Sequence, residues 1–258
     1  MLLKAMRTLA LTLLATAALA QQSLPRFEVA SVKPPGPKDR FIILFNYPGG
    51  MIRITNYTCE QLLEESLRVQ RFQISGAPAW TDVDKFVIEA KPPASSELST
   101  FKPSNPEAPL VDVQRQMLLA LLIDRFQLKF HRESRESPVY LLRRGRKEPK
   151  LEPTKHPNER IFLAGLLGGR NGGSVEGGNA TMDFIAWQLS ASLRRPVPDR
   201  TGLTGAFDFN LDHVYDPQEY DTVAIARRTA RELGLKLENS RAPVETIVID
   251  HVEKPAAN

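Results

Sequence analysis

The chain of 258 residues carries 34 Lys and Arg against 30 Asp and Glu, a formal charge of +4, and it has one Cys. This near balance gives no support to nucleic-acid binding, which needs a strongly basic surface. One Cys excludes a disulfide framework within the chain. The length is enough to bury a core without such bridges, as one large domain or two small ones.

The first twenty residues predict a secretory signal peptide. Lys4 and Arg7 precede an apolar run at 8–20, and Ala18-Leu19-Ala20 forms a small-x-small cleavage site. The apolar run is shorter than the roughly 20 residues that a membrane-spanning helix needs. We therefore expect cleavage near Ala20–Gln21 and export to the periplasm or the medium. We expect a soluble mature protein with no membrane span.

Residues 21–155 are predicted to form a first α+β half. Thr58 and Gln61 have the spacing of a capping box at the start of a helix. A proline-rich stretch at 91–110 predicts a linker or long loop. The segments 127–133 and 138–144 are expected to be two strands paired around a polar turn. The other expected elements are strands at 27–35, 51–58 and 86–90 and helices at 59–69 and 111–126.

A glycine-rich connection is predicted at 156–180, because residues 165–178 hold seven of the fifteen glycines. A second α+β half at 181–258 then repeats the order of the first. Its helix is capped by Thr181, and its expected elements are helices at 182–193 and 221–234, a strand at 207–214 and two closing strands within 235–252.

The two halves are expected to be a duplication. Thr58 and Thr181 occupy equivalent helix starts, and the Pro-Val pairs at 138–139 and 243–244 follow equivalent helices. Each half would be a small, mainly antiparallel sheet with two helices packed on one face. Pro138 and Pro243 would then lie at the start of the last strand of each half, where no N–H needs a partner.

The sequence nominates no catalytic, cofactor-binding or metal-binding residue, and no cofactor. Ser174 lacks the glycine pattern of a nucleophile elbow, and no phosphate-binding glycine motif occurs. Cys59 has the helical spacing of a small buried hydrophobe. Glu64 and Glu65 are expected on the exposed side of their helix, and Glu133 and Glu136 in a turn. Trp80 and Trp187 are interpreted as core residues, and 143–150 as a solvated basic loop or an anion contact.

The four histidines are the least weak candidates for a metal-binding or acid–base role. His131, His156, His213 and His251 lack the spacing that puts two imidazoles on one metal. Asp212-His213 and Asp250-His251 both follow β-prone runs and could meet in space. Polar residues at strand ends are the ordinary interpretation of both pairs.

Five separated segments carry a resemblance to a known family: "FEVASVKP", "FQISGAPAWTDVDKFVIEAK", "LLIDRFQLKFHRESRESPVYLL", "RPVPDRTGLTGAFDFNLD" and "APVETIVIDHVEKP". Together they resemble a soil-associated, acidobacterial family of exported proteins of unknown function, with many paralogues per genome. The chain departs from it at Cys59, where an aliphatic residue is expected. The resemblance implies a sensory or binding role in the envelope and supplies no catalytic residues. The stretch "RPVPDRTGLTGAFDFNL" is more weakly similar to short N-terminal modules of secretins and TonB-dependent transporters, which bind other proteins.

Two functions follow as hypotheses. The first is an exported, non-enzymatic module that binds an envelope protein or a small ligand. The alternative is an exported hydrolase whose site assembles from dispersed polar residues, with His131, His213, His251 and nearby acids as candidates.

Overall fold

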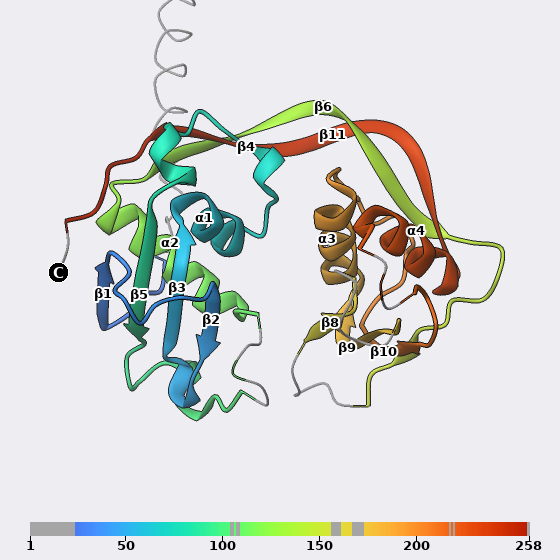
Figure 1. Ribbon diagram of the computed structural model, residues 1–258, viewed down its shortest axis with the longest axis horizontal. Helices are drawn as coiled ribbons and strands as arrows, with labels where there is room; N and C mark the ends of the chain where they lie inside the picture. Colours follow the sequence, from blue (N-terminus) through green and yellow to red (C-terminus); the bar gives the residue numbers. More distant parts are fainter. Residues whose placement is uncertain are drawn as a thin grey trace, which may run out of the picture.

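The computed structural model describes residues 24–103, 106, 109–155, 161–166, 173–216, 218 and 220–256. The expected signal peptide, its cleavage site and His156 lie outside these residues. The fold is α+β with mainly antiparallel sheets, as predicted, and it has two lobes joined by a long two-stranded ribbon (Figure 1).

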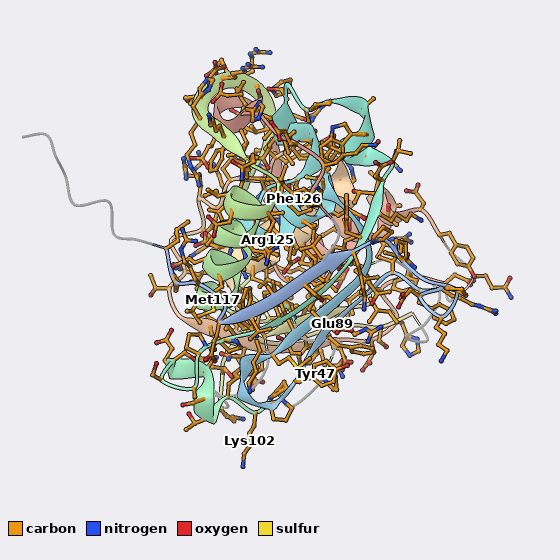
Figure 2. All side chains as sticks on the ribbon, turned by 90° about the vertical axis from the view of Figure 1, so that its left-hand side faces the viewer. Tyr47, Glu89, Lys102, Met117, Arg125 and Phe126 are labelled. Atoms are coloured by element: carbon orange, nitrogen blue, oxygen red, sulfur yellow. The ribbon has the colours of Figure 1, made fainter. Side chains whose placement is uncertain are left out.

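The first lobe is a sheet of four antiparallel strands in the order β1-β5-β3-β2, with helices α1 and α2. Figure 2 shows α2, which carries Met117 and Arg125 and is followed by Phe126, beside the strands, with Glu89 on β5. The elements are β1 (Val29–Lys33), β2 (Ile43–Asn46), β3 (Ile52–Thr58), α1 (Cys59–Leu67), β5 (Lys85–Lys91) and α2 (Asp112–Arg125). Short 3-10 helices occur at Pro48–Gly50, Arg71–Gln73, Ala79–Asp82 and Glu97–Thr100.

The second lobe has a four-stranded sheet in the order β7-β10-β9-β8, with helices α3 and α4. Its elements are β7 (Glu152–Pro153), β8 (Phe162–Ala164), β9 (Val175–Thr181), α3 (Met182–Leu193), β10 (Ala206–Leu211) and α4 (Thr222–Glu232). β8 and most of β9 fall in the range expected to be a glycine-rich connection. The glycines of β9 have a packing role, because a Cβ on Gly177 would lie 2.4 Å from the Phe209 ring.

The ribbon consists of β6 (Lys129–Arg144) and β11 (Leu235–His251), paired antiparallel along almost their whole length. β4 (Ile74–Ser75) adds a short parallel strand to β11. The prediction of two strands around a polar turn at 127–144 is wrong, and so is that of two strands in 235–252. The charged middle of β6 stays extended because its backbone pairs with β11 while its side chains remain in water; Arg132, for example, forms an ion pair with Glu245 on the opposite strand.

Each lobe builds its own core and closes it with one end of the ribbon. In the first lobe, Ile54 and Ile88 of the sheet pack with Leu62 of α1, Leu118 of α2 and Ile247 of β11. The second core is formed in the same way by α3, α4, β9, β10 and the other end of the ribbon. The ribbon is therefore part of both hydrophobic cores.

The helix starts are as the sequence predicts. Thr58 caps α1 in a full capping box with Gln61, and the Thr181 side chain accepts the N–H of Phe184 at the start of α3. Just before each cap the strand carries an Asn in the left-handed region, Asn56 with φ of 61° and Asn179 with φ of 48°. The pairing register shifts at both places, as a β-bulge requires.

Candidate functional site

A groove runs under the ribbon between the two lobes. It consists of two adjoining hollows of about 270 and 260 Å³, which share Gln73, Pro196 and Val244 as lining residues. We call it the bridge groove. Its other lining residues are Phe72, Ser137, Pro138, Asp183, Ala186, Trp187, Ser190, Arg194, Arg195, Val197, Pro198, Asp199, Pro243, Glu245 and Thr246.

One wall of the groove is a single face of α3. The residues of this face follow one another at spacings of one, three or four, so they share a side of the helix. They are Asp183, Ala186, Trp187, Ser190 and Arg194. Contacts between the lobes hold this helix in place beside the first lobe.

Two of these contacts come from the segment that follows α1. Gln70 donates its Nε2–H to the backbone oxygen of Trp187 at 3.0 Å. The guanidinium of Arg68 lies 5.7 Å from the centre of the Phe184 ring.

The loop after α3 is fixed by backbone bonds to β6. Tyr140 and Leu142 donate their N–H groups to the oxygens of Pro196 and Pro198 at 2.9 and 3.0 Å. Alternate residues of a strand point their N–H groups toward the same edge, so Pro138 occupies the next position at this edge.

Pro243 has the corresponding place on β11, two residues before Glu245, whose backbone oxygen accepts from Gln73 Nε2 at 2.9 Å. Both prolines thus lie in mid-strand, and the prediction that they start a strand is wrong. Each stands where a donor would face the groove instead of the ladder, so the ribbon loses no internal hydrogen bond.

The groove carries charges of opposite sign. Asp183, Asp199 and Glu245 line the larger hollow, and Arg194 and Arg195 line the other. Three of these groups already have partners. Asp199 accepts the N–H of Thr201 at 2.8 Å, Glu245 pairs with Arg132, and Arg195 donates to Asn239 at 3.1 Å.

Arg195 also lies with its guanidinium 4.4 Å from the centre of the Tyr140 ring. Within the part of the chain that the structure describes, the side chains of Asp183 and Arg194 form no hydrogen bond or ion pair. Both are exposed to solvent.

Aromatic surface is available at both hollows. Trp187 is half-buried and stacks on Phe184 with ring centres 6.1 Å apart, and its Nε1–H is buried without a partner among the described residues. Phe72 is 44% exposed at the other hollow. Trp80 packs edge-on against Phe86 in the first lobe, as predicted for a core residue.

The histidine candidates lie elsewhere. His131 lies on the ribbon between Asp250 and Glu133. Its Nδ1 is 2.9 Å from Asp250 Oδ1, and its Nε2 is 3.2 Å from Glu133 Oε1. These hydrogen bonds, first that of Asp250, raise the pKa of the exposed His131 imidazole. Glu133 lies within β6 and not in a turn, and its pKa is lowered by its bonds to Arg135 and His131.

The two Asp-His pairs do not meet. Asp250 contacts His131, and His251 lies 2.9 Å from Glu253 at the first-lobe end of β11. The carboxylate of Asp212, which follows β10, accepts from Ser174 Oγ at 3.3 Å. Figure 1 shows β10 in the other lobe. The described residues contain no group of three or more His, Cys, Asp or Glu side chains suited to a metal ion.

Two predictions about α1 had opposite outcomes. Cys59 is buried, as predicted, and its burial raises the pKa of the thiol to about 12. Glu64 and Glu65 are half-buried, so their predicted exposure is wrong. The segment before α2 covers this side of the helix, and the Glu65 carboxylate accepts the backbone N–H of Leu110. Burial raises the pKa of Glu64 to about 7.

A larger hollow of about 690 Å³ lies against the second-lobe sheet and is lined by Phe162, Phe209, Glu152, Glu176 and Asp208, among others. One of its carboxylates, Asp208, accepts backbone N–H groups from Asn179 and Lys155 at 2.8 and 3.2 Å, which gives it a structural role. We regard the bridge groove as the stronger candidate, because residues of both lobes and of the ribbon line it, whereas the larger hollow is confined to the second lobe.

Sequence reasoning did not find the groove. Its residues form no motif, and they come from four separate segments. The recurrence of prolines in "SPV", "RPVPD" and "APVE" was the available signal, because all three segments line it.

No helix in the described residues is long and apolar enough to cross a membrane. Comparison with curated proteins and with solved structures gave no match. A family model described as "Protein of unknown function (DUF3738)" matches residues 60–252, from the first turn of α1 to the residue after β11. The match includes both lobes' helices, the ribbon and every residue of the bridge groove, and the chain belongs to this family.

Proposed function

We propose that this protein is an exported, non-enzymatic binding module of the cell envelope that holds its ligand in the bridge groove. The observation that carries the proposal is the groove itself, a hollow between two lobes with apolar walls and charged groups of both signs at its rim. Binding sites combine apolar surface with a few placed polar groups, and they favour junctions between domains. The signal-like segment at 1–20 supports the location.

We also propose that the two halves are a duplication related by a pseudo-twofold axis through the middle of the ribbon. Ser137 pairs with Ala242, and each of the two is followed directly by a proline, Pro138 on β6 and Pro243 on β11. The parallel bridge from Asp199 to Leu142 in the second half resembles the pairing of Ile74 with Ile247 in the first. A groove at such an axis receives contributions from both halves. Failure of the two lobes to superpose in an experimental structure would contradict the duplication.

Fluorescence of Trp187 tests the binding proposal, because this indole lines the groove and the only other Trp can be removed as Trp80→Phe. The protein would be titrated separately with a short-peptide mixture, an oligosaccharide mixture and a fatty acid. We expect saturable change with at least one of these probes. The Pro243→Tyr variant, which places a ring in the groove at an exposed position, should weaken that binding at least tenfold.

Lys236→Tyr is the matched control, since this residue is also exposed on β11 but lies outside the groove. If no probe class changes Trp187 emission, or if Pro243→Tyr binds as the parent does, the groove is not the binding site. The location is tested separately by N-terminal sequencing of the protein recovered from a periplasmic fraction. The expected first residue is Gln21, and an intact Met1 would contradict export.

A further inference from the structure

The face of α3 in the groove carries two charges along one line, and neither forms a hydrogen bond or an ion pair with the described residues, although Asp183 interacts electrostatically with Arg68. Asp183 lies in the first turn of the helix and Arg194 is its C-cap residue. Eleven residues at 1.5 Å each place their Cα atoms about 16 Å apart along the helix axis. Both charges complement the helix dipole, which gives them a structural role as well.

The surface between these charges is suited to an extended chain. Trp187 and Ala186 line it from α3, and Pro243 and Val244 line it from the ribbon. An extended peptide advances about 3.3 Å per residue, so about five residues span the distance between the charges. Prolines at the ribbon edge remove donors there, so side chains and charges, and not an added β-strand, must provide the recognition.

We propose that the ligand of the bridge groove is an extended peptide segment of about five residues with a carboxylate at the Arg194 end and a cationic group at the Asp183 end. This inference rests on the proposed function and names its ligand class. Arg195 supports the same end, because its stacking on Tyr140 and its bond to Asn239 hold the guanidinium in place. An Arg has five N–H donors, so donors remain for a ligand carboxylate.

Arg194 allows a clean perturbation. Its φ is 50°, in the left-handed region that glycine adopts freely, so Arg194→Gly removes the guanidinium and relieves the backbone. Asp183→Asn removes the opposite charge with little change of shape. Arg231→Gln, at an exposed position of α4 outside the groove, matches the loss of one positive charge.

The test is calorimetric titration of the full mature chain with acetylated, amidated pentapeptides. One peptide has Lys and Glu at its ends around Ala-Val-Ala, and its partners replace Glu or Lys by Gln. We expect Arg194→Gly to lower the affinity for the Lys/Glu peptide about five- to tenfold and to leave the affinity for the peptide without Glu unchanged. Asp183→Asn should weaken binding of the Lys/Glu peptide and leave binding of the peptide without Lys unaffected. Arg231→Gln should bind all three peptides as the parent does.

An equal loss of affinity for the Lys/Glu peptide and for the Gln peptides would overturn the inference, because Asp183 and Arg194 would then not be interacting with the charges of the ligand. Binding of the oligosaccharide or the fatty acid, with no binding of any pentapeptide, would also overturn it while leaving the binding function intact. No response to any probe would remove both proposals. A fivefold or larger, charge-specific loss with each variant would support the peptide.

Discussion

The carboxyl group of Glu64 provides a pH-dependent test of how α1 is packed. Burial, and then the charge of Glu60, raise its pKa from 4.5 to about 7, and a backbone bond and the charge of Arg71 only partly oppose this. Glu64→Gln keeps the size of the side chain and an oxygen that can accept the same backbone bond. The variant differs from the parent chiefly in that it cannot ionise.

The sign of the effect follows from the direction of the shift. The folded chain binds this proton more tightly than the unfolded chain, so the parent protein loses stability as the pH rises from 4.5 through about 7. A shift of this size corresponds to at most about 3 kcal/mol at 1.36 kcal/mol per unit. Glu64 is only half-buried, and screening by water reduces the expected contribution to about 1–2 kcal/mol.

Urea denaturation at pH 4, 6 and 8 measures this contribution as the difference between variant and parent. We expect no difference at pH 4, and at pH 8 a variant more stable by about 1–2 kcal/mol, or about 2–8 °C in Tm for a chain of this size. Glu97→Gln, at an exposed position in the 3-10 helix Glu97–Thr100, is the control and should show no such dependence. A difference between Glu64→Gln and the parent that does not change with pH would refute the reasoning.

Three further predictions concern packing and capping. The Cys59 thiol, with its pKa raised to about 12 by burial, should resist a thiol reagent in the native protein and react once urea unfolds it; fast reaction of the folded protein would contradict its burial. Thr58→Ala should lower the free energy of unfolding by about 1 kcal/mol in urea, because the cap of α1 is lost, and an unchanged midpoint would show that the cap contributes nothing. Gly177→Ala should cost about 1–3 kcal/mol, because the new methyl group meets the Phe209 ring at 2.4 Å. Gly36→Ala, with its nearest atom at 3.5 Å, should be neutral, and equal effects of the two would exclude a steric cause.

Local signals in the sequence predicted the regular core elements well. The capping residues Thr58 and Thr181 mark the helix starts correctly, because capping is decided by a few neighbouring residues. The alternation of residues 51–58 likewise predicts the strand β3. Short strands such as β2, β7 and β8 were missed, since two to four residues carry too little pattern.

The errors come from contacts between distant segments. A polar run such as Arg132–Glu136 resembles a turn until its partner on β11, more than 100 residues later, is known. The sequence of α1 predicts exposure of Glu64 and Glu65, and only the positions of the segments near Arg71 and Leu110 show that they are covered. The bridge groove is of the same kind, because its walls meet only when the ribbon has joined the lobes.

The ribbon also sets the order in which the chain can fold. β6 is synthesised about 90 residues before β11, which at roughly 5–20 residues per second leaves it without its partner for about 5–20 s. During that time it is a 16-residue strand with two open edges, a form prone to pair with other chains. Its central Arg and Glu residues and Pro138 disfavour such pairing, so the charged middle of β6 protects the nascent chain. Neither lobe can close its core until the last strand arrives, and folding of the whole molecule therefore waits for the C-terminal segment.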